Sequence, residues 1–119
     1  MQKQVLVVDD DPLFLDLVTD MFAIEEVEVI PALDATDALS VLKVARPSFI
    51  VSDFEMPGMN GIEFHSHLLR DQGTKNIPFC FMTGTSDQVL MEYTEQHHLR
   101  LLSKNNLVRG LIGLLNELK

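Results

Sequence analysis

Short apolar runs recur along the whole chain, and amphipathic stretches separate them. This alternation restricts the fold more than any other feature, because the runs suit buried strands and the stretches suit helices. The runs predict strands at Gln4–Val8, Val27–Ile30, Phe49–Asp53, Ile77–Met82 and Leu99–Leu102. The stretches predict helices at Pro12–Phe22, Ala35–Val44, Ile62–Leu69, Ser86–Gln96 and Asn106–Leu118. Repeated strand–helix units form a parallel sheet with helices on both faces, so the sequence predicts a doubly wound five-stranded α/β fold.

The length and composition fit one compact domain. We expect residues 1–119 to form this domain. Hydrophobic residues make up 46% of the chain, which is enough for a core without disulfides. The single cysteine, Cys80, lies within the apolar run Ile77–Met82, where a buried and unreactive thiol is expected. No apolar run approaches the length of a membrane span, and no signal peptide is evident. We therefore expect a cytoplasmic protein that does not enter a membrane.

The charge limits the class of partner. Nine Lys and Arg residues against eighteen Asp and Glu residues give a net charge of −9. Binding of nucleic acid needs a basic surface, so this domain is a poor candidate for that function. The acidic surplus suits a cation site, although acidic residues spread over the surface for solubility also explain it.

Polar side chains stand at the ends of four of the five predicted strands. Asp9 and Asp10 follow the first strand, Asp53 ends the third, Thr83 follows the fourth and Lys104 follows the fifth. In an open parallel sheet, ligands bind beyond the carboxyl ends of the strands, so we expect these groups on one rim. Carboxylates bind Mg²⁺ through oxygen, and a lysine and a hydroxyl can position and neutralise a phosphoryl group. The set therefore predicts phosphoryl transfer to a carboxylate, with Asp53 as the nucleophile.

Four motifs carry a resemblance to a known family. They are Val8–Asp10, Asp53–Gly61, Met82–Gly84 and Ser103–Lys104. In residues, order and spacing they resemble the receiver domain of two-component response regulators, and the similarity spans the whole chain. The resemblance implies a flavodoxin-like (βα)5 fold in which the strands lie in the order 2-1-3-4-5.

The resemblance also implies a function in phosphorelay signal transduction. Asp53 would accept a phosphoryl group from the phosphohistidine of a histidine kinase or a histidine phosphotransfer protein. Thr83 would donate a hydrogen bond to a phosphoryl oxygen, and Lys104 would pair with the phosphoryl group or with Asp53. Such a domain is a signalling switch for a partner or an effector rather than an enzyme with a substrate of its own.

A magnesium site is the third implication of the resemblance. Asp10 would bind Mg²⁺ directly, and Asp9 would act largely through water. Asp53 and the backbone carbonyl of Glu55 would complete the protein ligands.

Three residues depart from the family pattern. Asn105 stands where the family usually has a proline that follows a cis peptide bond. A cis bond before a residue other than proline costs about 2.5–4 kcal/mol. We favour a trans Lys104–Asn105 bond over a strained cis one. Leu101 occupies the switch position, where a Tyr or Phe usually turns inward as Thr83 moves, so the usual aromatic relay is in question. Glu55 lies at a variable position near the acceptor, and we expect its side chain to point into solvent.

Two helices offer surfaces for partners. We take Phe14, Leu17, Val18 and Met21 as the inward face of the first helix, which leaves Leu13 and Leu15 partly exposed. We expect these two leucines to contact the phosphodonor. The last helix is apolar over a wider arc than one core-facing stripe requires, so its outer face would suit a homodimer or a downstream effector domain.

The histidines do not suggest a metal site. His65 and His67 are two residues apart on a predicted helix and face different ways. His97 and His98 fall in a turn with no cysteine or carboxylate cluster near them. We expect all four histidines to be solvated surface residues.

Two alternatives remain open from the sequence. A receiver-like interaction module would bind a partner without phosphorylation, through its last two helices and fifth strand. A haloacid-dehalogenase-like phosphatase also uses an Asp nucleophile, but it expects a second acid two residues later, which Glu55 imitates only loosely.

Overall fold

The structure is a computed structural model that describes residues 3–84 and 87–117. Within these residues the strands are β1 (Lys3–Val8), β2 (Val27–Ala32), β3 (Phe49–Asp53), β4 (Phe79–Thr83) and β5 (Arg100–Ser103). The helices are α1 (Pro12–Ile24), α2 (Ala35–Val41), α3 (Gly61–Leu69), α4 (Gln88–Gln96) and α5 (Leu107–Glu117), with a short 3-10 turn at Lys104–Asn106. None of the described helices is long and apolar enough to cross a membrane.

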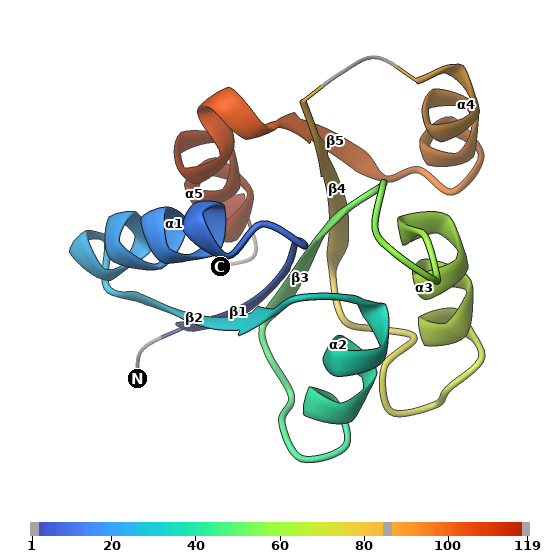
Figure 1. Ribbon diagram of the computed structural model, residues 1–119, viewed down its shortest axis with the longest axis horizontal. Coiled ribbons are helices and arrows are strands. Elements are labelled where there is room, and N and C mark those ends of the chain that lie inside the picture. The colour runs from blue at the N-terminus through green and yellow to red at the C-terminus, as the bar shows by residue number, and fades with distance from the viewer. Residues whose placement is uncertain (1–2, 85–86, 118–119) are drawn as a thin grey trace.

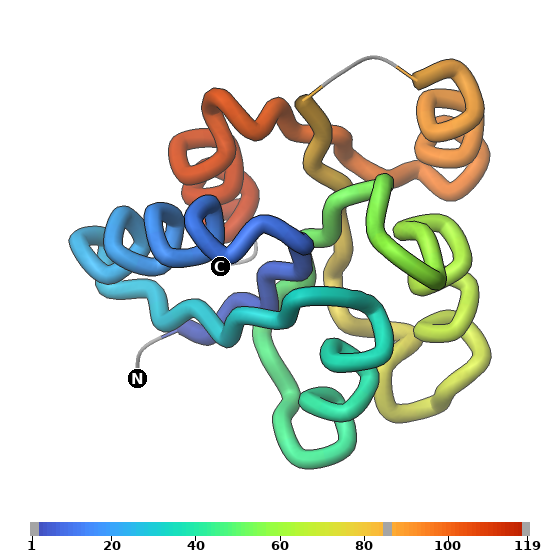
Figure 2. Tube along the Cα trace, in the orientation of Figure 1, coloured from blue at the N-terminus to red at the C-terminus, as the bar shows by residue number. Residues whose placement is uncertain are grey.

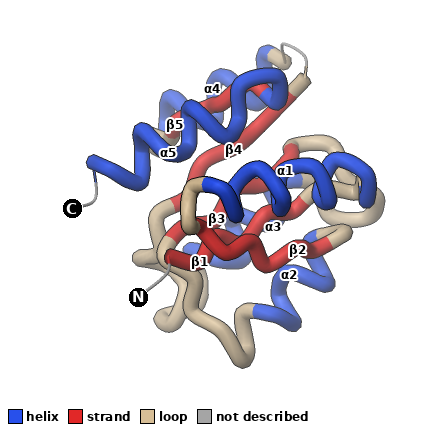
Figure 3. The backbone as a smooth tube through the Cα atoms, turned by 90° about the vertical axis from the view of Figure 1, so that its left-hand side faces the viewer, coloured by secondary structure: helices blue, strands red, loops and turns tan. Residues whose placement is uncertain are grey.

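The strands form one parallel sheet in the order β2-β1-β3-β4-β5, which confirms the predicted fold class and strand order. Helices α1 and α5 cover one face, and α2, α3 and α4 cover the other (Figures 1 and 3). The trace in Figure 2 shows α1 and α5 side by side. Each predicted element is present; β3 has the predicted bounds, and the ends of the other elements differ from the prediction by one to a few residues. The predicted helix start at Ser86 and helix end at Leu118 lie outside the described residues.

Strand β1 explains why the helices divide into two layers. Successive side chains of a strand point to opposite faces. Val5 and Val7 accordingly join the core under α1 and α5, whereas Leu6 and Val8 join the core under α2, α3 and α4. All four are fully buried. A strand covered on both faces has no solvent-facing side and therefore no alternation of polar and apolar residues. For this reason β1 and β3 contain continuous apolar runs.

The buried face of α1 differs from the prediction. Leu15, Val18 and Phe22 are buried, whereas Leu17 and Met21 are 56% and 43% exposed. The apolar residues of this helix surround most of its axis, so helical spacing alone permits two inward faces. Packing selects the face that buries the large Phe22 ring against the sheet. The expected contact between Leu15 and a phosphodonor is therefore wrong, because the Leu15 side chain is only 4% exposed.

Leu15 and Leu13 offer a matched pair of truncations on one helix. We expect Leu15→Ala to lower the free energy of unfolding by about 2–5 kcal/mol, because it leaves a cavity in the core. Leu13→Ala, at a side chain that is 78% exposed, should change it by less than about 0.5 kcal/mol. Urea denaturation measures both values. Equal losses in the two variants would contradict the buried face described above.

Helix α4 is joined to α3 by a cluster of aromatic and histidine rings. His65 is buried, and its Nδ1 shares a hydrogen bond of 2.6 Å with the hydroxyl of Tyr93. The His65 ring also packs on Phe79 at 4.6 Å between centroids, and Tyr93 stacks on His97 at 4.0 Å. The expectation that all four histidines are solvated is thus wrong for His65, while the other three are exposed. Burial, with a smaller effect from His97, lowers the pKa of His65 to about 4.

This lowered pKa makes stability depend on pH. Between about pH 4 and pH 6.5 the unfolded chain binds a proton at His65 that the folded chain does not, so stability falls as pH falls through that window. We expect the free energy of unfolding to drop by roughly 1 kcal/mol from His65 between about pH 7.5 and pH 5.5. Urea denaturation at both pH values measures the drop.

The matched variants are His65→Leu and His67→Leu. His65→Leu removes the buried imidazole, so its pH-dependent loss should be smaller than that of the unmodified protein. His67 is exposed on the same helix, and His67→Leu should leave the loss unchanged. The same pH dependence in all three proteins would show that His65 is not the group responsible.

Candidate functional site

The predicted polar residues meet at the carboxyl edge of the sheet. Asp53 is the last residue of β3 and is 7% exposed. Asp9 follows β1, is fully buried, and donates its backbone N–H to the Ala32 carbonyl at 3.1 Å, which continues the pairing with β2. Lys104 begins the 3-10 turn directly after β5. Parallel pairing aligns these strand ends, so residues far apart in the sequence share one rim.

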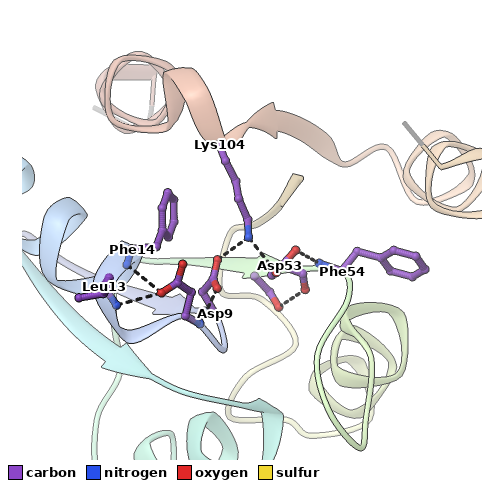
Figure 4. Close-up of polar contacts among 8 residues, drawn as sticks. Asp9, Leu13, Phe14, Asp53, Phe54 and Lys104 are labelled. Carbon is purple, nitrogen blue, oxygen red and sulfur yellow. Dashed lines mark hydrogen bonds and ion pairs between the residues drawn. The ribbon is translucent and has the colours of Figure 1, made fainter. Parts of the chain in front are cut away.

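The Lys104 ammonium joins the two buried carboxylates, as Figure 4 shows. Its Nζ lies 2.7 Å from Asp9 Oδ2 and 2.9 Å from Asp53 Oδ2. The second contact is also a hydrogen bond that Lys104 donates. Both oxygens bind the same ammonium, so the three side chains hold one another in place.

The site is short of positive charge. Burial raises the pKa of the Asp53 carboxyl above its usual value, and the neighbouring Asp9 charge adds to this, although Lys104 opposes both. Burial alone would lower the pKa of the Lys104 ammonium, but its bonds to Asp9 and Asp53 outweigh burial and raise that pKa. A buried carboxylate cluster with one ammonium favours the arrival of a further cation.

A tight loop after β3 fixes Asp53. The Phe54 N–H donates to Asp53 Oδ1 at 2.8 Å, and the Gly61 N–H donates to the Phe54 carbonyl at 2.8 Å. A Cβ on Gly61 would lie 2.5 Å from the Asp53 carbonyl oxygen, so only glycine allows this close approach. Gly58 has a φ of +77°, which favours glycine in the same turn. The Pro- and Gly-rich motif thus fixes the position of the end of β3.

The carboxylates also meet the requirements of a divalent cation site. Ligand oxygens of Asp9, Asp10 and Asp53 lie within 4.8 Å of one another. Asp9 Oδ2 is buried, and its close contact is the ion pair with the Lys104 ammonium. Asp10 is exposed at the mouth of the site. Three carboxylates are ligands that suit a hard cation such as Mg²⁺.

An open cleft of about 510 Å³ gives access to Asp53. It is lined by Asp10, Asp53, Glu55, Met56, Pro57, Thr83, Gly84 and Lys104. Thr83 ends β4 and is one of these lining residues. The Glu55 side chain is exposed, as expected. All of the predicted site residues except Asp9 and Leu101 therefore line one cleft, and Asp9 lies beneath it.

The residues that depart from the family pattern have clear structural places. No cis peptide bond occurs within residues 3–84 and 87–117, so the Lys104–Asn105 bond is trans, as favoured. The Asn105 N–H donates to Ser103 Oγ at 3.2 Å, a bond that a proline there could not make. Leu101 is partly buried and packs on the core beneath α2, α3 and α4.

Two contributors to the site were not predicted. Asp11 caps α1, with its Oδ1 accepting from the Leu13 N–H at 3.0 Å and from the Phe14 N–H at 3.4 Å. Phe14 lies with its ring centroid 5.2 Å from Lys104 Nζ. The Asp11-Pro12 pair is a recognisable helix start. The contact between Phe14 and Lys104 joins distant parts of the chain, and no local pattern indicates it.

Comparison with known proteins places these features in one family. The model of the response regulator receiver domain matches residues 5–115. The chain is 36% identical to the two-component response regulator ARR21 of Arabidopsis thaliana over 86 residues, covering 71% of this chain and 14% of that protein. It is 33% identical to the DNA-binding response regulator MtrA of Mycolicibacterium smegmatis over 90 residues, covering 76% of this chain and 40% of that protein. The chain thus spans less than half the length of these relatives.

Solved structures show the same fold. The chemotaxis protein CheY4 of Vibrio cholerae superposes with a TM-score of 0.82 at 24% identity, covering 93% of this chain and 97% of that one. A CheY-like receiver domain from Methanospirillum hungatei superposes with a TM-score of 0.85 at 20% identity, covering 98% and 96%. Since the family match covers nearly the whole chain and the acidic rim lies where the fold places ligands, this chain belongs to the response regulator receiver domain family of two-component signalling.

Proposed function

We propose that the protein is a phospho-acceptor switch in which Asp53 receives a phosphoryl group from a phosphohistidine. The donor would be a histidine kinase or a histidine phosphotransfer protein, the class of partner with which receiver domains interact. One observation carries the proposal: the Asp53 carboxylate borders an open cleft and is held by the Lys104 ammonium at 2.9 Å. An acceptor oxygen, a fixed cation and an approach for the donor are thereby present together.

The transfer step needs an oxygen nucleophile and charge neutralisation. An Asp53 oxygen would bond to phosphorus as the phosphorus–nitrogen bond of the donor breaks, and the electron pair of that bond returns to the imidazole nitrogen. Lys104 would move its ammonium from the Asp53 oxygen toward a phosphoryl oxygen. Thr83, which also lines the cleft, would donate a hydrogen bond from its hydroxyl to another phosphoryl oxygen.

Asp9, Asp10 and Asp53, with the backbone carbonyl of Glu55, would hold Mg²⁺. The bound ion would neutralise the phosphoryl oxygens and the carboxylates at once. The fit of the donor set supports this assignment, because ligand oxygens of three carboxylates lie within 4.8 Å of one another with a single ammonium among them. As the family resemblance implies, Asp10 would bind the ion directly and Asp9 would act mainly through water.

The output would be a change in binding to a partner or an effector. We propose residues 1–119 as one receiver domain, with an effector domain as a further part of the signalling route, since MtrA is described as DNA-binding and is much longer than this chain. Leu101 would serve as the switch position by changing its packing, in place of a turning ring. Three further predictions from the sequence remain predictions. They are a homodimer through α5, an interaction module that works without phosphorylation, and a cytoplasmic location.

Phosphorylation at Asp53 is directly measurable. Incubation with Mg²⁺ and acetyl phosphate or phosphoramidate should add one phosphoryl group by intact mass, and Asp53→Asn should abolish the addition because it removes the nucleophilic oxygen. Asp16→Asn, a change of the same charge on the exposed side of α1, should leave it intact. An unmodified wild-type protein with every donor, a cognate kinase included, would refute the proposal and favour the phosphorylation-independent module.

Magnesium binding should also stabilise the fold. A ligand that binds only the folded state raises the free energy of unfolding, by about 1.4 kcal/mol at ten times its Kd. We expect Mg²⁺ to raise the Tm of the wild type and of Asp16→Asn, and to have little effect on Asp10→Asn. Differential scanning calorimetry with Mg²⁺ or EDTA measures the shift. Equal shifts for Asp10→Asn and Asp16→Asn would place the ion elsewhere.

A further inference from the structure

Phe14 lies against the Lys104 ammonium, although it belongs to none of the motifs that form the site. Its ring centroid is 5.2 Å from Lys104 Nζ, within the range in which an aromatic face attracts an ammonium. Figure 4 shows Phe14 on the α1 side of the site, with Lys104 reaching in from the end of β5. Both residues line a cavity of about 640 Å³ between α1 and α5. Lys104 and Gly84 line both this cavity and the acidic cleft.

Core packing explains an apolar residue at this position, because Phe14 packs against the edge of the core, but it does not require an aromatic ring. The face of α1 that packs on the sheet consists of Leu15, Val18 and Phe22, and each of these is buried. Phe14 lies beside that face and is only partly buried. The cap provided by Asp11 holds the first turn of the helix, and therefore the backbone of Phe14, at the rim. An aliphatic side chain would cover the same core, but it has no ring face to offer Lys104.

The ammonium has competing partners. An ammonium has three donors, and two of its neighbours here are Asp9 Oδ2 and Asp53 Oδ2. Those same carboxylates are the ligands that a divalent cation would use. If Asp9 turned to such a cation, Lys104 would lose one of its two anionic partners. A neutral ring then keeps an attraction for the ammonium and adds no negative charge that would compete with the carboxylates.

We propose that Phe14 is a positioning residue for Lys104. Its ring holds the ammonium beside Asp53 when Asp9 turns from Lys104 to a cation. The role in phosphoryl transfer rests on the proposed function of Asp53. The contact with the ammonium, and its response to Mg²⁺, can be measured without phosphorylation.

The direct readout is the NMR signal of the Lys104 ε-methylene group, which a nearby ring face shifts upfield. We expect this shift in the wild type, both without and with Mg²⁺. Phe14→Leu should lose the upfield shift, and Phe14→Tyr should keep it because the ring is kept. Leu17→Ala, a control change in the same cavity, should also keep it. Phe14→Met supplies a second variant without a ring if Phe14→Leu does not fold.

The second readout is binding of beryllofluoride in Mg²⁺, which mimics the phosphoryl group. Loss of the ring should weaken it by roughly two- to fivefold, with Phe14→Tyr at the wild-type value. The proposal is overturned if the upfield shift survives in Phe14→Leu, or if wild-type Lys104 loses it when Mg²⁺ is added. Equal weakening in Phe14→Leu and Phe14→Tyr would also overturn it. Failure of the wild type to bind beryllofluoride would count against the proposed function, and the NMR shift would then decide the role of Phe14.

Discussion

The bridge from Lys104 to Asp9 and Asp53 is the interaction on which the rest of the site depends. It brings together the ends of β1, β3 and β5, which are otherwise joined only through the sheet. Two carboxylates this deeply buried would repel each other strongly without a shared cation. The ammonium therefore makes the acidic rim compatible with folding. It also leaves the rim with a surplus of negative charge that a metal ion can satisfy.

The fold was predictable because its signals are local and repeated. Continuous apolar runs such as β3 identify strands buried on both faces, and the polar residues that follow them identify the ligand-binding rim. Parallel pairing then brings Asp9, Asp53 and Lys104 together, as the structure confirms. For these residues, position at a strand end carried the information, and position is visible in the sequence.

The failures occurred where packing decides between equivalent local patterns. Helix α1 is apolar around most of its axis, so only contact with the sheet could show that Leu15 is inside and Leu17 outside. His65 looks like a surface residue because histidine is polar, yet it shares a hydrogen bond with Tyr93 from the next helix. Its burial depends on a partner that the residues around it do not reveal. The contact of Phe14 with Lys104 is of the same kind.

The division of the core by the sheet has a consequence for how such a chain can vary. Val7 and Leu6 are neighbours in sequence, but they belong to different cores on opposite sides of β1. Substitutions that lie far apart in the two cores and share no packing partner should have additive effects on stability. Each face can then accept new packing, and with it new partner surfaces, without disturbing the other. The backbone hydrogen bonds of the sheet meanwhile keep the strand ends in register. The same acidic site at the edge of the sheet can therefore be combined with many different residues on the outer faces of the helices.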